Sequence, residues 1–269
     1  MFRHKGKKRT LRHNLRIASL LSFVAGIVNV AGFLAVQRLT TNVTGHFAFF
    51  VDEVFKFNFW QAFIYFLYIF FFFLGSFVSN LLVEIISRTN DKLIYKIPII
   101  IESLILFLIA VFGQFLITRN PNLLALSLLF AMGLQNSLVT TISNATVRTT
   151  HLTGLFTDLG IELSQLFFYI RLEQKNKLYS SIKLRLTIIT FFFLGGLLGG
   201  IFYSMLKLYV LAIAATILII GIIYDDLKLK LMIQNRNQKI GKANITNTFG
   251  QAVKRTHEIL RDYKGTKLR

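Results

Sequence analysis

Several apolar runs of bilayer-spanning length constrain the fold of this chain more than any other feature. A membrane-spanning α-helix needs about 20 predominantly apolar residues, and the stretches 15–36, 59–86 and 97–117 reach that length. Hydrophobic residues make up 54% of the chain and charged residues only 16%. A membrane β-barrel would alternate apolar and polar residues in segments of about ten, and that pattern is missing. The sequence therefore predicts an all-α integral membrane protein.

Apolar segments follow one another through the middle of the chain, between two basic tails. The tails are residues 1–14 and 226–269, and the predicted transmembrane domain is 15–225. The expected apolar segments are 15–36, 44–55, 59–86 and 97–117, followed by 123–145, 153–170, 186–206 and 208–224. The segment 44–55 is too short to cross a bilayer at 1.5 Å per residue.

The second half of this domain repeats polar landmarks of the first. The stretch from Thr40 to Phe47 shares five of its eight residues with the stretch from Thr149 to Phe156. Two further matches keep the same order along the chain. Phe23-x-x-Gly26-x-x-Asn29 recurs as Phe130-x-x-Gly133-x-x-Asn136, and Phe71 to Gly75 recurs as Phe191 to Gly195. We expect two internal repeats, about 15–118 and 122–225.

The short segments 44–55 and 153–170 decide the topology. If they are re-entrant or half-helices, six helices cross the membrane, and three crossings per repeat invert one half relative to the other. Both tails and the basic loops 88–96 and 171–185 then lie inside, as the positive-inside rule favours. The alternative is seven or eight full spans, for which the length of 153–170 is the main argument.

The net charge of +19 comes mainly from the tails and loops. Of 31 Lys and Arg residues, seven lie in 1–16 and eleven in 226–269. This distribution fits cytoplasmic flanks that attract anionic lipid, and nucleic acid is not an expected partner. The chain contains no Cys, so disulfides and thiolate metal sites are excluded. The expected partners are the lipid bilayer, an unidentified small solute and further copies of the chain.

Each repeated Thr-Gly pair is expected to begin a helix. A threonine can cap such a helix, and the free N–H groups and partial positive charge of a helix start suit an anionic group. The alternative is an ordinary cap at a membrane-interface turn. Neighbouring amides and a histidine add polarity; Asn29 and Asn136 either bond across helices or line a pore. The candidate substrate-binding residues are Thr44, Gly45, Asn29, Gln135, Asn136, His151, Thr153 and Gly154.

Three acids follow the helix starts and are candidates for proton or ion coupling. Glu53 and Glu162 occupy the same offset in the two repeats, and Asp158 lies one turn before Glu162 on the same helix face. Carboxylates at membrane depth usually face a cavity, a partner or a proton path. For Glu53 the alternative is a position at the aqueous surface.

The sequence contains no catalytic motif that indicates an enzyme, such as Gly-x-Ser-x-Gly, a Walker loop or His-Glu-x-x-His. No cofactor or metal site is expected either. The predicted function is a transporter or channel for a small solute, with an anion as the favoured class and the site near the membrane midplane. The alternative is a membrane scaffold or a lipid-interacting protein without transport activity.

The second-half motif also carries a family resemblance. The stretches Gly133 to Asn136, Arg148 to Gly154 and Asp158 to Gly160 resemble the YoaK family of bacterial multi-pass membrane proteins. The first-half stretch from Asn42 to His46 is similar to that family's Met-Thr-Gly-Asn segment, with Val43 and His46 in place of Met and Asn. The resemblance covers about 15–225 and implies a bacterial inner-membrane protein with about six spans. It implies no activity, because the family is largely uncharacterised.

Overall fold

The computed structural model describes residues 10–88, 93–169, 171–228, 230–232, 234 and 236, and every regular element in these ranges is a helix. The chain divides into two compact units, Met1–Ile222 and Ile223–Arg269. The elements of the first unit are α1 (Leu11–Val36), α2 (Val43–Phe55), α3 (Phe59–Ser87), α4 (Lys96–Arg119), α5 (Pro121–Ser143), α6 (Leu152–Gln165), α7 (Leu172–Leu206) and the 3-10 turn η2 (Lys207–Tyr209), after which a further helix begins at residue 210.

Five helical stretches in the described residues are long and apolar enough to cross a membrane. They are α1, α3, α4, α5 and the stretch Leu172–Met232, which η2 interrupts. The prediction of an all-helical fold with several bilayer-length apolar helices is therefore confirmed. In contrast, α2 has 13 residues and α6 has 14, or about 20 Å at 1.5 Å per residue. Because α6 ends at Gln165, it is shorter than the expected 153–170.

The expected basic loop at 171–185 is instead the first part of α7, so that expectation was wrong. The segment contains no Gly or Pro, and most of its residues form helices readily. Its apolar side chains Leu178, Ile182 and Leu184 are buried. The result is a helix of 35 residues, about 52 Å long, whose charged first part extends well beyond its apolar second part.

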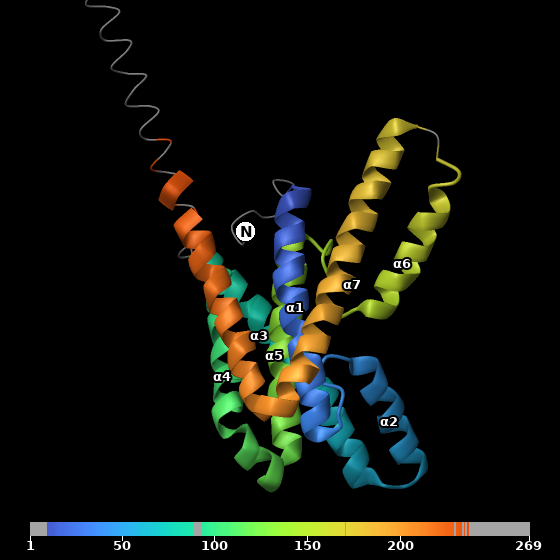
Figure 1. Cartoon of the computed structure of the whole chain (residues 1–269). Coiled ribbons are helices and arrows are strands. Elements are labelled where there is room, and N and C mark those ends of the chain that lie inside the picture. The colour runs from blue at the N-terminus through green and yellow to red at the C-terminus, as the bar shows by residue number, and fades with distance from the viewer. Residues whose placement is uncertain are drawn as a thin grey trace, which may run out of the picture. The chain divides into compact units, whose positions relative to one another are not determined.

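Consecutive long helices of this unit run in opposite directions (Figure 1). We call the end at which α1 begins the upper end and the end at which α1 stops the lower end. The helices α1, α4 and α7 run toward the lower end, and α3, α5 and the helix from residue 210 run toward the upper end. The matching first helices of the two predicted repeats, α1 and α5, therefore run in opposite directions.

Glycines allow α1 and α7 to cross at backbone contact. A Cβ added at Gly26 would lie 2.1 Å from the carbonyl oxygen of Phe192, and one added at Gly195 would lie 2.0 Å from that of Phe23. Since real Cβ atoms essentially never come closer than 3.0 Å to another heavy atom, only glycine fits at both positions. Small residues at helix contacts of this kind are typical of membrane proteins.

The crossing of α3 and α5 is built in the same way. A Cβ added at Gly133 would lie 2.2 Å from the carbonyl oxygen of Phe72, and one added at Gly75 would lie 2.1 Å from that of Phe130. These residues belong to the Phe and Gly motifs that match between the two halves. In both crossings, the first helix of one half of the chain (α1 or α5) therefore packs against the third helix of the other half (α7 or α3).

Candidate functional site

The chain leaves α1 and α5 through the same backbone conformation. Gln37 follows α1 with φ 53° and ψ 35°, and Asn144 follows α5 with φ 54° and ψ 53°. The left-handed conformation raises the free energy of a residue with a side chain by about 1 kcal/mol or more. A residue in this conformation commonly ends a helix. Each break leads through a few residues to a short helix, α2 or α6.

Threonines in each break bond to an asparagine of the preceding helix. The hydroxyl of Thr41 donates to Oδ1 of Asn29 at 2.7 Å. In the second half, the hydroxyls of Thr149 and Thr150 both donate to Oδ1 of Asn136 at 3.1 Å. The matched asparagines therefore hold the two breaks against α1 and α5. Each of these bonds joins an asparagine to the break that follows its own helix, rather than to another helix.

The start of α2 is capped, and His46 in its first turn is buried. The side chain of Asn42 accepts a hydrogen bond from the backbone N–H of Gly45 at 3.3 Å. His46 is fully buried, and its Nε2 lies 2.5 Å from the carbonyl oxygen of Leu39. A carbonyl only accepts, so Nε2 carries the proton and donates it. Burial lowers the pKa of His46, and the bond to Leu39 opposes part of that effect.

Aromatic rings of α3 pack against His46 in the first turn of α2. The ring of Tyr68 packs against that of His46 with centroids 4.9 Å apart, and Tyr65 follows at 6.0 Å. The guanidinium of Arg38 lies 5.6 Å from the ring centroid of Tyr65, a cation–π contact. The hydroxyl of Tyr68 donates to Oδ1 of Asn122 at 2.6 Å. The rings therefore enclose His46, whereas Asn42 and Thr44 of the same helix start are exposed.

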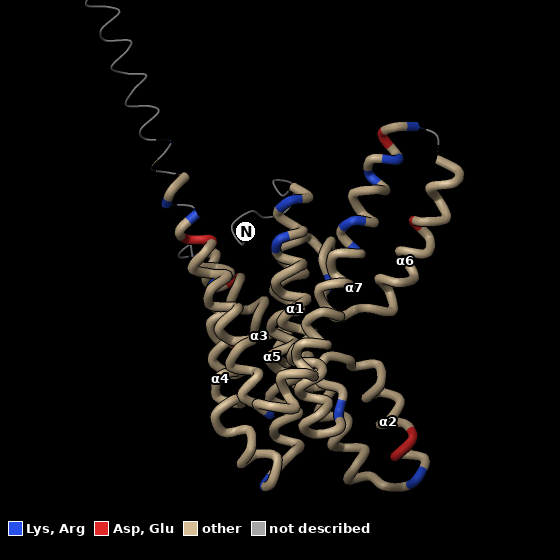
Figure 2. Tube along the Cα trace, in the orientation of Figure 1, with Lys and Arg blue, Asp and Glu red and all other residues tan. Residues whose placement is uncertain are grey.

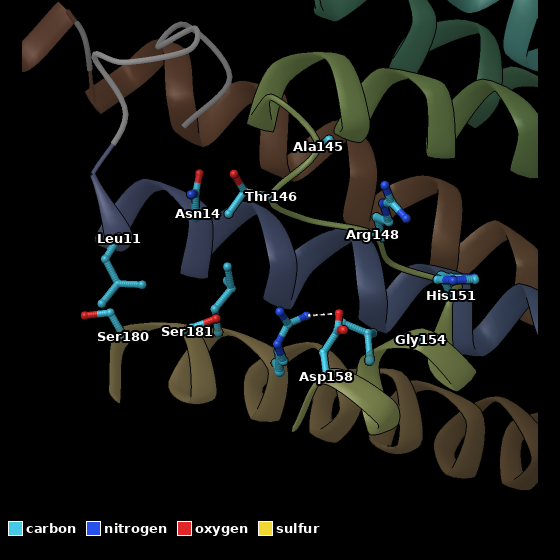
Figure 3. A pocket seen from close by; sticks show the side chains of 13 residues that line it. Leu11, Asn14, Ala145, Thr146, Arg148, His151, Gly154, Asp158, Ser180 and Ser181 are labelled. Atoms are coloured by element: carbon cyan, nitrogen blue, oxygen red, sulfur yellow. Dashed lines mark ion pairs between the residues drawn. The ribbon is translucent and has the colours of Figure 1, made fainter. Parts of the chain in front are cut away.

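The start of α6 borders a cavity of about 610 Å³ (Figure 3). Its walls come from the first turns of α1, the break after α5, the first turns of α6 and the first part of α7. The lining residues are Leu11, Asn14, Ala145, Thr146, Arg148, His151, Gly154, Leu155, Asp158, Ser180, Ser181, Leu184 and Arg185. Polar and charged side chains point into the space between these elements (Figure 3).

The first turn of α6 lacks the cap that α2 has. His151 occupies the N-cap position, but its side chain makes no capping hydrogen bond to the described residues of this turn. A Cβ added at Gly154 would lie 2.5 Å from Cδ2 of the His151 ring, so only glycine lets the ring lie over the first turn. Helix starts without a side-chain cap leave N–H donors for solvent or a ligand.

One guanidinium joins α6 to α7 along the cavity wall. Arg185 bonds Asp158 Oδ2 through Nη1 at 2.8 Å and Glu162 Oε2 through Nε at 2.8 Å. The hydroxyl of Ser181 donates to the other oxygen of Glu162 at 2.5 Å. Glu162 is only 12% exposed, so its ion pair is shielded from water, whereas Asp158 is 48% exposed.

The predicted site residues separate into three groups. His151, Gly154 and Asp158 line the cavity, and Glu162 adjoins it through Arg185. Gln135 and Asn136 lie inside the bundle, where Nε2 of Gln135 donates to the carbonyl oxygen of Leu21 at 3.0 Å. The remaining residues, Thr44, Gly45, Asn29, Glu53 and Thr153, are not part of the cavity lining.

Glu53, at the end of α2, accepts a hydrogen bond from Nδ2 of Asn58 at 2.8 Å.

Sequence reasoning missed Arg185 and Ser181, because their segment was expected to be a loop. Their spacing of one helical turn was the available signal. No group of three His, Asp or Glu side chains in the part of the chain that the structure describes is arranged to hold a metal ion.

These features define an apolar multi-helix protein with the length and composition of a membrane protein. The chain belongs to the family described as "Protein of unknown function (DUF1275)", whose model matches residues 17–224. No curated protein and no solved structure matches the chain.

Proposed function

We propose that this protein is a membrane transporter or channel for a small anionic solute. The observation that carries the proposal is the difference between the two helix breaks. Polar and charged side chains line a cavity at the start of α6, whereas aromatic rings of α3 pack against His46 in the first turn of α2. Alternating access, in which a site opens to one side of the membrane at a time, is a recurrent mechanism in transporters built from such repeats.

The proposed topology has six crossings arranged as two inverted repeats. The crossings are α1, α3, α4, α5, the apolar part of α7 and the helix from residue 210. The opposite directions of α1 and α5 and the reciprocal glycine crossings support it. In Figure 1, α2 and α6 both begin near mid-height of the bundle and run toward opposite ends. Half-helices that start at mid-depth are a recurrent design in such transporters.

The charges support an orientation with the upper end, and both termini, in the cytoplasm of a bacterial inner membrane. The lower helix ends carry few Lys and Arg residues (Figure 2). These are Arg38, Lys56, Arg119 and Lys207. The upper ends carry Arg12, Arg16, Arg88, Lys96, Arg148, Arg171, Lys175, Lys177, Lys183 and Arg185. Cytoplasmic flanks are enriched in such cations, so the cavity opens inward.

The chemistry of the cavity favours an anion. Arg148 lines it and is exposed, and His151 and the uncapped first turn of α6 lie beside it. A guanidinium binds carboxylate or phosphate with paired hydrogen bonds, and the helix start adds partial positive charge. Arg185 is occupied by Asp158 and Glu162, so Arg148 is the proposed anion-binding cation. We propose no enzymatic reaction.

A panel of acetate, succinate, phosphate and sulfate tests this proposal on purified protein. An anion at 100 times its dissociation constant stabilises the folded state by about 2.7 kcal/mol. At least one of these anions should therefore raise the unfolding temperature. Arg148→Gln should remove that rise, and Lys56→Gln, which deletes a cation at the end of α2, should retain it. A wild-type protein that responds to none of the four, or an unchanged response in Arg148→Gln, contradicts the proposal.

A membrane scaffold is the second candidate. It is favoured by the paired state of the break residues, since Thr41, Thr149 and Thr150 all bond to asparagines. Uptake of the stabilising anion into proteoliposomes separates the two functions. A transporter or channel accumulates or equilibrates the anion, and a scaffold binds without moving it.

A further inference from the structure

Glu102 lies in the second turn of the apolar helix α4, near its upper end, with no exposed surface and no partner among the described residues. Its side chain is 0% exposed, and neither carboxyl oxygen has a hydrogen-bond partner in that part of the chain. We propose that Glu102 is a proton-binding site, buried on α4 and separate from the cavity, that loses and regains its proton when the protein changes conformation.

The three acids predicted from the sequence to couple protons or ions all have hydrogen-bond partners, whereas Glu102 has none among the described residues. Asp158 and Glu162 share Arg185, and Glu53 accepts from Asn58. An unpaired carboxylate in an apolar interior costs several kcal/mol, whereas a neutral acid costs far less. In the conformation described here, Glu102 therefore holds its proton. Release requires a conformation in which water or a cation reaches it.

The described elements packed against α4 supply no cation for this acid. They are α5, α3 and η2, and α5 contains no charged or titratable residue. The helical residues 210–222 contain none either; the described residues beyond them belong to the second unit and include Tyr224, Asp225, Asp226, Lys228 and Lys230. The charged or titratable residues of the packed elements and of α4 itself are Glu84, Tyr65 and Tyr68 on α3, Lys207 and Tyr209 in η2, and Lys96 and Arg119 at the two ends of α4. None of these described residues is a hydrogen-bond partner of Glu102.

Other unpaired polar atoms lie at a similar distance from the helix ends. Ser79, Glu102 and Gln135 are each six to eight residues from the upper end of their helix, which is about 9 to 12 Å along the axis. Within the described ranges, the hydroxyl of Ser79 and Oε1 of Gln135 are both buried without a partner. Three helices therefore carry free polar atoms at a similar distance from their upper ends, and a water molecule or a moving proton would satisfy such atoms.

Gln135 is also bonded to the break that borders the cavity. Its Nε2 donates to the hydroxyl of Thr149 at 3.4 Å, and Thr149 lies between the cavity-lining residues Arg148 and His151. A movement of this break therefore changes the surroundings of Gln135. The role of the proton in driving transport rests on the proposed function, but proton binding by Glu102 does not.

Dicyclohexylcarbodiimide tests proton binding directly, because this apolar reagent enters membranes and adds to protonated carboxyl groups. The full-length protein in lipid vesicles is treated between about pH 5 and about pH 9, a range that spans ordinary side-chain titrations, and modified peptides are identified by mass spectrometry. We expect modification at Glu102 that slows at least about tenfold as the pH rises. Glu102→Gln should abolish it, and Glu84→Gln, which alters an exposed acid on α3, should leave it unchanged. No modification at Glu102, or a rate independent of pH, overturns the proposal.

A second measurement links the proton to the cavity. Thr146→Cys places a thiol in the cavity wall of this Cys-free chain. The ratio of its rate with an impermeant thiol reagent to the rate of a free reference thiol, which removes the ordinary pH dependence of thiolate formation, should change by at least about fivefold across the same pH range. The double variant Thr146→Cys, Glu102→Gln should show no such change. If Glu102 is modified but the thiol reacts alike in both backgrounds, the proton site stands and its coupling to the cavity is wrong. Failure of anion binding with both results intact refutes only the proposed function.

Discussion

Replacing Gly195 by alanine should force α1 and α7 apart. A Cβ at this position would lie 2.0 Å from the carbonyl oxygen of Phe23, whereas ordinary contacts begin at 3.4 Å. Because the obstructing atom belongs to a helix backbone, no side-chain rotation relieves the clash. The helices must separate by more than about 1 Å, which forfeits packing along the whole crossing. We expect a loss of about 3 kcal/mol in the free energy of unfolding.

Gly200→Ala on the same helix is the matched control. Its added Cβ would meet only the side chain of Val30, at 3.4 Å, among the described residues, and alanine favours a helix over glycine by about 1 kcal/mol. The assay is the thermal unfolding midpoint of each variant in detergent. Gly195→Ala should lower it by roughly 6 to 12 °C, and Gly200→Ala should leave it unchanged or higher. Equal midpoints for the two variants would refute the close-crossing argument.

Two further predictions concern ionisable groups. Arg185→Gln leaves the shielded Glu162 without its cation and should lower the free energy of unfolding by about 1 to 3 kcal/mol. The control Lys177→Gln breaks a solvated ion pair with Glu173 and should change the free energy of unfolding by less than about 0.5 kcal/mol. Similar unfolding midpoints for the two variants would contradict the shielding of the Arg185–Glu162 pair. Burial lowers the pKa of His46, so the folded state favours the neutral ring, and the stability from this residue is lost as the pH falls below about 6.5. His46→Gln should flatten the acid side of the plot of unfolding midpoint against pH, and an unchanged acid side would show that His46 is not responsible.

The positions of the long helices could be predicted because they follow from the lengths of the apolar segments and from the polar residues between them. Apolar runs indicate the long helices. The matched motifs contain the glycines at both helix crossings, which are Gly26, Gly75, Gly133 and Gly195. The expected loop 171–185 was wrong because a run of charged residues does not by itself end a helix. In fact α7 continues beyond its apolar part, with its buried face formed by residues such as Leu178.

The contrast between the two breaks could not be predicted from the Thr-Gly stretches, since they are nearly alike. It depends on the helices that pack against them. At the offset that relates Phe71 to Phe191, Tyr65 on α3 corresponds to Arg185 on α7. Tyr65 packs near His46 beside the first break, whereas Arg185 pairs with acids of α6 and lines a cavity.

The most direct test of the central claim is the sidedness of two cysteines. Asn120→Cys lies between α4 and α5 at the lower end, and Thr146→Cys lies in the cavity wall. An impermeant thiol reagent should label Asn120→Cys, but not Thr146→Cys, in intact cells. In inside-out vesicles the pattern should reverse. Labelling of Thr146→Cys from outside intact cells, with Asn120→Cys protected, would contradict an inward-facing cavity between inverted halves.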